Sequence, residues 1–443
     1  MTEKMKPSGI GWIKDIPESW KTSKVKFLAT EPGTLFLDGD WIESDVIEES
    51  GIRYLTSGNV GAGFYKDQGS GHISEKTFRE LHCLKVFPGD LMISRLNEPI
   101  GRACIVPEGE PCYVVAVDNV ILRPNKEYDR KFIMYAMNTE GYAEHGNMIA
   151  RGATMSRVSR SQLGQFWLAF PSIAEQRAIA DFLDTQCAKI NSVIVDIEKQ
   201  IETLQKYKKS LITEVVTKGL DRSVPMKDSG VEWIGDVPEK WDCKKLKYII
   251  LESLQYGANE AGDDYKDDYP RYIRITDITE ENTLKDEGKL SLQPDVAAPY
   301  ILKNGDILFA RSGATVGKTF FYTADYGLAA FAGYLIRARI NPEMALPRFV
   351  YYSTLGVGYE NWKNTVFTQA TIQNIGADKY AQFFVTLPQI DEQKSIVEYL
   401  DAKCVQIDDI IKNKQQQLVV VQQHKKSLIY EYVTGKKRVT EVS

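Results

Sequence analysis

The chain has 443 residues, 43% of them hydrophobic and 26% charged, with a formal net charge of −5. This length predicts at least two domains, and the composition excludes a disordered or membrane-spanning protein, since no apolar run reaches the ~18 residues of a membrane span. The acidic average means that any basic surface for nucleic acid must be local. The first residues lack the apolar stretch of a secretory signal and the six cysteines form no CxxC pair, so we expect a cytoplasmic protein with free thiols.

A tryptophan-rich opening occurs twice in the chain. The string GIGWIKDIPESW at 9–20 returns as GVEWIGDVPEKW at 230–241, and KKSLI occurs at both 208–212 and 425–429. Further matches between these points keep an offset of roughly 216 to 221 residues. Two copies are too few for a solenoid, so the pattern indicates duplication of one complete unit.

The first predicted element is a mixed β domain over residues 1–173, followed by a long helix over 174–219. Short β-branched and aromatic runs such as RYLTSGNV (53–60) lie between Gly, Pro, Asn and Asp turns, as is typical of strands. The same order follows in the second copy, with a β-rich domain over 220–390 and a helix with a C-terminal tail over 391–443.

Apolar residues recur every three or four positions along both helical segments, which predicts a coiled coil rather than a helix lying only on its own domain. Lys208, Lys414 and Lys425 interrupt this pattern. The predicted seam consists of Leu183, Ile190, Ile194, Ile197, Ile201, Leu204 and Leu211 in the first helix, and Leu400, Ile407, Ile411, Leu418, Val421 and Leu428 in the second, with Cys187 and Cys404 at interleaved positions.

The connection between the first helix and the second opening is only about a dozen residues, so the second domain must follow the far end of that helix. If the second helix packs against the first, it has to run in the opposite direction. We therefore predict an α+β protein with two mixed β-rich domains separated by an antiparallel two-helix coiled coil, with an internal pseudo-twofold repeat. A helix of ~40 residues is ~60 Å long and would act as a rigid spacer.

Several strings together resemble the DNA-specificity subunits of type I restriction-modification enzymes. They are WIKDIPESW and WIGDVPEKW, GDILFARSGATVGK (305–318), the Ala-Thr pairs at 153–154 and 370–371, and the helix starts PSIAEQRAIADFLD (171–184) and PQIDEQKSIVEYLD (388–401). The resemblance covers residues 9 to 435 and implies two target-recognition domains, each binding one half of a bipartite, asymmetric DNA sequence. It further implies two modification (adenine-N6 methyltransferase) subunits and restriction subunits as partners, which would use S-adenosylmethionine, ATP and Mg²⁺. This chain itself would have no cofactor, no metal and no catalytic residue.

Polar residues in the loops after predicted strands are the candidates for DNA contact. Arg and Lys suit phosphates and guanine edges, and Asn and Gln suit adenine edges. For any single position, a solvated surface residue or a salt-bridge partner remains the alternative. The candidates are Arg53, Tyr54, Ser57, Asn59, Arg95, Arg102, Arg151, Thr154 and Arg157 in the first copy, and Arg274, Thr276, Asp277, Arg311, Lys318, Gln369, Thr371 and Gln373 in the second.

The basic pairs Arg95/Arg311 and Arg102/Lys318 recur at equivalent positions, so we expect them to hold the DNA backbone, whereas sequence readout should lie where the copies differ. The spacing of Gly313 and Gly317 leaves three residues where a phosphate-binding loop needs four, which argues against nucleotide binding. A stand-alone DNA-binding regulator or a protein scaffold of the same two-domain form is the alternative function, and copurification with methyltransferase subunits would discriminate between them.

Overall fold

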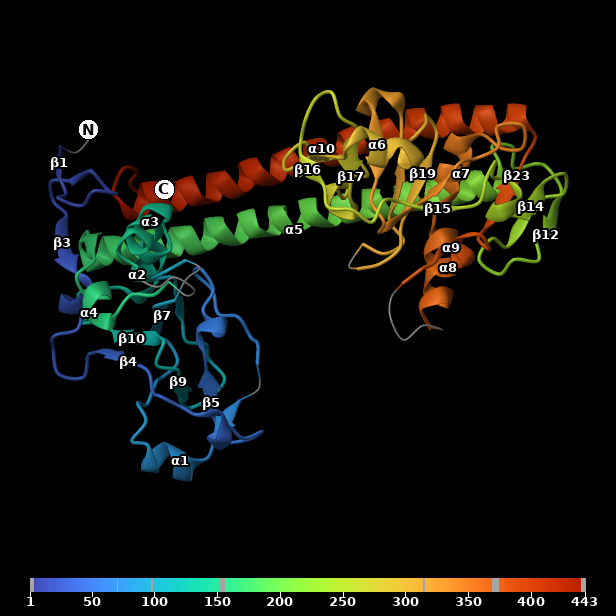
Figure 1. Cartoon of the computed structure of the whole chain (residues 1–443). Helices are drawn as coiled ribbons and strands as arrows, with labels where there is room; N and C mark the ends of the chain where they lie inside the picture. Colours follow the sequence, from blue (N-terminus) through green and yellow to red (C-terminus); the bar gives the residue numbers. More distant parts are fainter. Residues whose placement is uncertain are drawn as a thin grey trace. The chain divides into compact units, whose positions relative to one another are not determined.

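The computed structural model describes residues 4–69, 71–96, 99–150, 156–313, 315–368 and 374–439. The chain divides into two units, of which unit 1 comprises residues 1–197 and 416–443 and unit 2 comprises residues 198–415. Each unit contains one β-rich head, which we name head 1 (residues 1–170) and head 2 (residues 220–387) (Figure 1). None of the helices in the described ranges is long and apolar enough to cross a membrane.

Head 1 is built on a four-stranded antiparallel sheet in the order β4-β10-β7-β8. Its central strands are short runs rich in Leu, Ile and Val, and they are buried because both faces of the sheet are covered. A second sheet, β6-β5-β9, contains a parallel pair between β5 and β9. The elements of head 1 are β1 (Met5–Pro7), β2 (Asp15–Pro17), β3 (Lys21–Lys24), β4 (Leu35–Asp38), β5 (Ile52–Leu55), β6 (His72–Ile73), α1 (Glu75–Glu80), β7 (Leu91–Ser94), β8 (Ala103–Ile105), β9 (Tyr113–Val115), β10 (Asn119–Arg123), α2 (Arg130–Met137), α3 (Glu140–Ile149), α4 (Arg160–Leu163) and β11 (Trp167–Phe170).

Head 2 repeats this order. Its antiparallel sheet β15-β22-β19-β20 is equivalent to β4-β10-β7-β8, and its parallel pair β17/β21 is equivalent to β5/β9. The elements of head 2 are β12 (Met226–Asp228), β13 (Asp236–Pro238), β14 (Asp242–Lys245), β15 (Gln255–Tyr256), β16 (Asp263–Asp264), β17 (Arg271–Ile273), β18 (Leu290–Ser291), α6 (Pro294–Ala297), β19 (Ile307–Ala310), β20 (Thr319–Phe321), β21 (Ala329–Phe331), β22 (Leu335–Ala338), α7 (Pro347–Ser353), α8 (Val357–Thr368), α9 (Ala377–Tyr380) and β23 (Phe384–Leu387). The repeat in the sequence is therefore a repeat of the fold.

The two long helices are α5 (Ile173–Lys218) and α10 (Ile390–Val433). All thirteen residues of the predicted seam are buried or half-buried in these helices, as a packed seam requires. The residues between the seam positions over the middle of each helix are mostly exposed, so each helix has one apolar stripe and a wide polar face.

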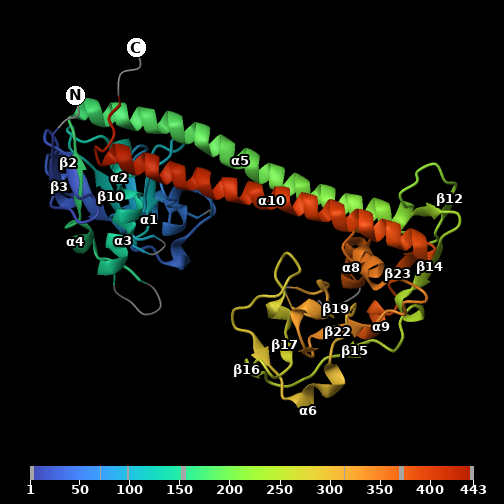
Figure 2. The same cartoon turned by 90° about the horizontal axis from the view of Figure 1, so that it is seen from above.

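The helices run in opposite directions in both units. In unit 1 the early Phe182 of α5 packs against the late Tyr432 of α10, with ring centroids 4.6 Å apart. In unit 2 the late Lys208 of α5 lies 2.6 Å from the early Asp408 of α10. Figures 1 and 2 show the green and red helices side by side within each unit, which confirms the predicted antiparallel pair.

Each head packs against the start of the helix that follows it in the chain and the end of the other long helix. Burial of this kind contributes about 1.5–3 kcal/mol for each large apolar side chain. The helix residues that join the core of head 1 are Ile179, Leu183 and Cys187 of α5 with Leu428, Ile429 and Val433 of α10, and those that join the core of head 2 are Ile396, Leu400 and Cys404 of α10 with Leu211, Ile212 and Val216 of α5. Neither repeat therefore completes its own core.

The duplicated opening supplies part of this junction. Trp20 is fully buried in head 1, and Trp241 is 2% exposed in head 2. The indole Nε1 of Trp241 donates a hydrogen bond to Oε2 of Glu392 at the start of α10, over 3.0 Å. The tryptophan that closes each opening is repeated because it fills the corner between head and helix.

A buried glutamine near each helix start joins the head to the helix. The Oε1 atom of Gln176 accepts a hydrogen bond from the Asp129 N–H over 2.9 Å, and its Nε2 donates to the Pro171 carbonyl over 3.0 Å. Gln393 makes the equivalent bonds with Leu346 and with the proline before α10, at 2.7 and 2.8 Å. Both glutamines are at most 1% exposed, so their amides satisfy backbone groups that water does not reach.

Candidate nucleic-acid interface

Three loop segments of head 1 that carry predicted site residues meet in space. They are the turn after β5 at 56–60, the described residues 95–96 and 99–102 after β7, and the segment before α4 at 156–158. The Arg95 carbonyl accepts a hydrogen bond from the Val158 N–H over 3.1 Å. Arg102 donates to the Ser57 carbonyl over 3.0 Å, which connects the first two segments.

Head 2 brings the equivalent segments together. The Arg311 carbonyl accepts a hydrogen bond from the Ile375 N–H over 2.8 Å, so the loop after β19 lies beside the segment before α9. Lys318 on the same hairpin lies 3.5 Å from Glu280, which follows the turn after β17. In both heads the structure therefore gathers segments that are far apart in the sequence.

Two predicted contacts in the turn after β5 are internal braces. Asn59 is 2% exposed, and its Nδ2 donates to the carbonyls of Lys66 and Gln68 at 2.9 and 2.8 Å. Arg53 donates to the carbonyls of Gln68 and Gly69. Asn59 is thus a buried group rather than the surface group expected from the sequence, because the loop folds back over its amide. Tyr54 is half-buried, and burial raises the pKa of its hydroxyl.

The Arg102 side chain also stabilises the loops, because it donates hydrogen bonds to backbone carbonyls of two segments. Its Nε donates to the Val60 carbonyl over 2.8 Å, its Nη1 to the Leu96 carbonyl over 2.9 Å, and its Nη2 to Ser57. Burial lowers the pKa of the guanidinium. The sequence did not reveal this role, because the acceptors lie up to 45 residues away.

Arg95 is compensated by acidic neighbours. Its guanidinium lies 3.4 Å from Asp38 and 3.9 Å from Asp118, and its Nη2 donates to the Val117 carbonyl over 2.6 Å. Only 15% of the side chain is exposed. The structure therefore favours the salt-bridge alternative for Arg95.

The turn after β17 differs chemically from its counterpart on the same backbone. Asp277 is 3% exposed and accepts two hydrogen bonds from the Arg274 guanidinium, which raises the pKa of Arg274. Thr276 between them is exposed. In head 1 this position is a glycine, so the exposed part of the turn differs between the copies, as expected for a region that reads sequence.

Arg311 and Lys318 have fewer hydrogen-bond acceptors than their equivalents Arg95 and Arg102, although Nε of Arg95 is also without an acceptor. The Arg311 guanidinium lies over the ring of Tyr256, 4.9 Å from its centroid, and its buried Nε has no hydrogen-bond acceptor. Lys318 is 13% exposed, and its Nζ has no hydrogen bond.

The other candidates divide into one exposed cation and five residues that the structure does not describe. Arg157 is exposed and forms a β-bridge with Leu96 through its backbone. The predicted residues outside the described ranges are Arg151, Thr154, Gln369, Thr371 and Gln373.

A repeated acid–arginine pair was missed from the sequence. Asp90 is 1% exposed and accepts two hydrogen bonds from Arg123, at 2.9 and 2.6 Å. Asp306 makes the same pair with Arg339, at 2.9 and 2.8 Å. The Gly-Asp pair recurs in both copies, and in both an arginine follows the aspartate by 33 residues. This repeated spacing could have predicted the pair from the sequence.

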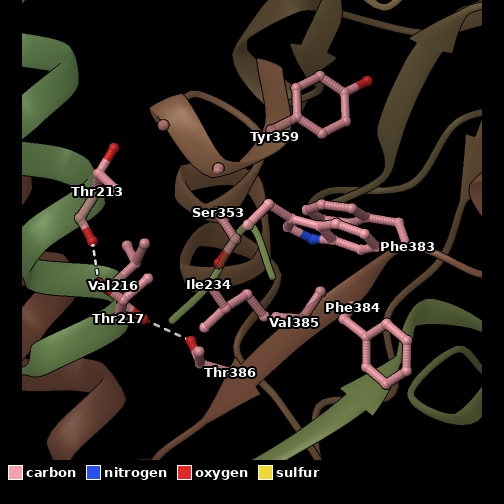
Figure 3. A pocket seen from close by; sticks show the side chains of 13 residues that line it. Thr213, Val216, Thr217, Ile234, Ser353, Tyr359, Phe383, Phe384, Val385 and Thr386 are labelled. Atoms are coloured by element: carbon pink, nitrogen blue, oxygen red, sulfur yellow. Dashed lines mark hydrogen bonds between the residues drawn. The ribbon is translucent and has the colours of Figure 1, made fainter. Parts of the chain in front are cut away.

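A small crevice in unit 2 lies between the end of α5 and head 2 (Figure 3). Its polar groups bond one another, since Thr386 donates to the Val216 carbonyl and Thr213 accepts from the Val357 N–H. We assign it to the packing of helix against head. Among the described residues no group of three or more His, Cys, Asp or Glu side chains is placed to hold a metal ion.

Comparison with known families identifies this duplicated architecture. The model of the type I restriction modification DNA specificity domain matches residues 17–203 and again residues 238–419. The chain belongs to this family. Each match begins in an opening and ends in a long helix, so the family domain corresponds to one repeat, and the chain is a specificity subunit with two of them.

Relatives and solved structures agree with this assignment. The type I restriction enzyme StySPI specificity subunit of Salmonella potsdam is 21% identical, over 95% of this chain and 89% of its own length. The EcoBI specificity subunit of Escherichia coli is 25% identical, over 70% and 66% respectively. A chain from a solved type I R-M system, studied for its assembly and conformational transition, has a TM-score of 0.70 at 14% identity and covers 95% of this chain and 99% of its own. The predicted family and the fold class of this specificity subunit are thereby confirmed.

Proposed function

We propose that this specificity subunit binds a bipartite, asymmetric DNA sequence with one half-site for each head. The observation that supports the proposal is that the heads share their scaffold and differ in the side chains of equivalent turns. The turn TSGNV (56–60) and the turn RITDI (274–278) have the same backbone order, a strand followed by one helical turn, with different side chains. Two such surfaces would read two different half-sites.

We further propose that the chain binds two adenine-N6 methyltransferase subunits and restriction subunits and leaves the chemistry to them. S-adenosylmethionine, ATP and Mg²⁺ would then be bound by those partners and not by this chain. Its relatives are named as specificity subunits of type I restriction enzymes, which supports the proposal that this chain acts as one subunit of an assembly. Such an assembly acts on cellular DNA, so we place it in the cytoplasm.

Exchange of one head tests the division of the site. Residues 20–170 would be replaced by the corresponding head of another specificity subunit, and the methylated sequence would be mapped in cells that also carry the modification subunit. We expect one half of the recognised sequence to change and the other half to stay. The reciprocal exchange of residues 241–387 should change only the other half. If either exchange altered both halves, the assignment of one half-site to each head would be wrong.

Copurification tests the partners. The full chain should retain two methyltransferase subunits, and methylation should require them. Recovery of a chain that binds its DNA sequence with no such subunit would favour a stand-alone regulator.

A further inference from the structure

The two heads carry different residues at one equivalent position at the edge of the antiparallel sheet. Asp38 at the end of β4 pairs with Val120 of β10, and Tyr256 at the end of β15 pairs with Ile336 of β22. Because both pairs occupy the same step of the same sheet, Tyr256 of head 2 stands where head 1 has Asp38.

A second position next to it has changed in the same way. The Arg95 N–H donates to the Asp118 carbonyl over 2.9 Å, and the Arg311 N–H donates to the Tyr334 carbonyl over 3.0 Å. These equivalent bonds place Tyr334 where head 1 has Asp118. The two positions that hold aspartates near the arginine of head 1 therefore hold tyrosines near the arginine of head 2.

The charge of the arginine is balanced in head 1 and unbalanced in head 2. Arg95 lies within 3.9 Å of both of its acids, of which Asp38 also lies 3.4 Å from Arg160, so its charge is compensated before a phosphate approaches. In the part of head 2 that the structure describes, Arg311 forms no ion pair and no side-chain hydrogen bond. A guanidinium without a neighbouring carboxylate has no internal counter-charge to offset its attraction for an external anion.

The tyrosine also holds the guanidinium in place. The ring of Tyr256 lies 4.9 Å below the Arg311 guanidinium carbon, within the range of a cation–π contact. Its hydroxyl accepts a hydrogen bond from the Ala377 N–H over 3.0 Å, which fixes the ring. Stacking occupies one face of the guanidinium and Nε is buried, so the two terminal nitrogens are the atoms left to bind a phosphate through two hydrogen bonds.

The surroundings are open to a ligand and contain a second cation. Tyr256 is 40% exposed and Tyr334 is 61% exposed, so the site lies at the surface. Lys318 on the same hairpin adds a buried positive charge whose only ion-pair partner among the described residues is Glu280, and Glu280 is 91% exposed. Arg311 and Lys318 thus lie on one hairpin, where the one recorded carboxylate partner is the exposed Glu280 beside the lysine, and two positive charges favour a phosphate over a single base edge.

We propose that Arg311, fixed on Tyr256, binds a phosphate of the DNA backbone, and that the equivalent Arg95 does not. The inference rests on the proposed DNA-binding function and makes it more specific, because it assigns this contact to head 2 alone. Head 1 would hold its half-site through other groups, among which the exposed Arg157 is available.

Binding of the full chain, copurified with its modification subunits, to a fluorescent mixed-sequence duplex tests this proposal. Each phosphate contact contributes about 0.9 to the slope of log K against log salt, so Arg311→Gln should weaken binding and reduce the slope by about one. Arg95→Gln is the matched control and should leave the slope unchanged. Tyr256→Asp introduces the carboxylate of head 1 and should act like Arg311→Gln, whereas Tyr256→Phe should bind almost as the wild type does.

The outcomes separate this proposal from the function on which it rests. A wild-type slope for Arg311→Gln, or an equal loss for Arg95→Gln, would overturn the assignment to head 2. A loss of affinity with an unchanged slope would indicate a contact to a base edge and overturn the phosphate contact. Thermal melts of each variant identify any that fail to fold. If Arg311→Gln fails to fold, Tyr256→Asp provides the test in its place. If the wild-type complex binds no duplex at low salt, the proposed function itself fails.

Discussion

The two repeats agree where head meets helix and differ at the edge of the sheet. Gln176 and Gln393 make equivalent bonds at the helix starts, whereas Asp38 at the sheet edge corresponds to Tyr256. A duplicated chain whose cores share helix ends cannot change a junction without loss of stability. Residues at the edge of the sheet have no such restriction, so they can differ between the heads where DNA would bind.

The largest effect should follow loss of the tryptophan at either junction. Trp20→Ala and Trp241→Ala should each lower the free energy of unfolding by about 3–5 kcal/mol, because a buried indole leaves a cavity. Trp241→Ala should cost more, since it also leaves Glu392 without the hydrogen bond that Trp20 does not make. Urea unfolding of the full chain measures the difference, and Trp41→Ala, which removes a side chain of a residue that is 72% exposed, is the control. A cost as small as that of the control would contradict the junction described here.

The two acid–arginine pairs should contribute unequally to the free energy of unfolding. Asp90→Asn leaves Arg123 without a carboxylate and should cost about 2–3 kcal/mol. Asp306→Asn should cost less, because Arg339 keeps Glu252 at 2.8 Å. Calorimetric melts of both variants, with a substitution of the exposed Asp45 as control, test the order. Equal costs would mean that Glu252 contributes nothing to Arg339.

The two junction glutamines should contribute almost equally to the free energy of unfolding. Gln176→Ala and Gln393→Ala each leave buried backbone groups unpaired and should cost about 1–2 kcal/mol. Gln176 makes one further bond, to the Glu127 carbonyl at 3.1 Å, so its loss should be slightly larger. The exposed Gln205 on α5 gives the matched control, Gln205→Ala, with an expected change near zero. Urea midpoints that do not move for either variant would show that water replaces these amides.

The smallest effect should come from the lysines in the helix seam. Lys208→Ala removes an ion pair with Asp408, which is 55% exposed, and should cost about 0.5 kcal/mol at low salt and less at high salt. Lys425 instead donates to the neutral Asn191 over 2.7 Å, so the cost of Lys425→Ala should not depend on salt. Melting temperatures at low and high salt test this contrast, and equal salt dependence of the two variants would contradict it.

The sequence by itself determined the repeat, the two helices and their direction. Heptad spacing and the short connection after Lys218 are local features, and an antiparallel pair follows from them by chain geometry. The recurring seam residues are buried or half-buried because a helix stripe depends only on a period along the chain.

Only the tertiary structure decided which polar residues of the site are free. Asn59 and Arg102 are of residue types that suit DNA contacts, yet both donate to backbone carbonyls, Asn59 within its own loop and Arg102 to the turn after β5. Arg95 and Arg311 are alike in sequence, but the state of each depends on a residue more than fifty positions away, Asp38 or Tyr256. A hydrogen bond or an ion pair depends on proximity in space, and the sheet brings these side chains together because β10 pairs with β4 on one side and with β7 on the other.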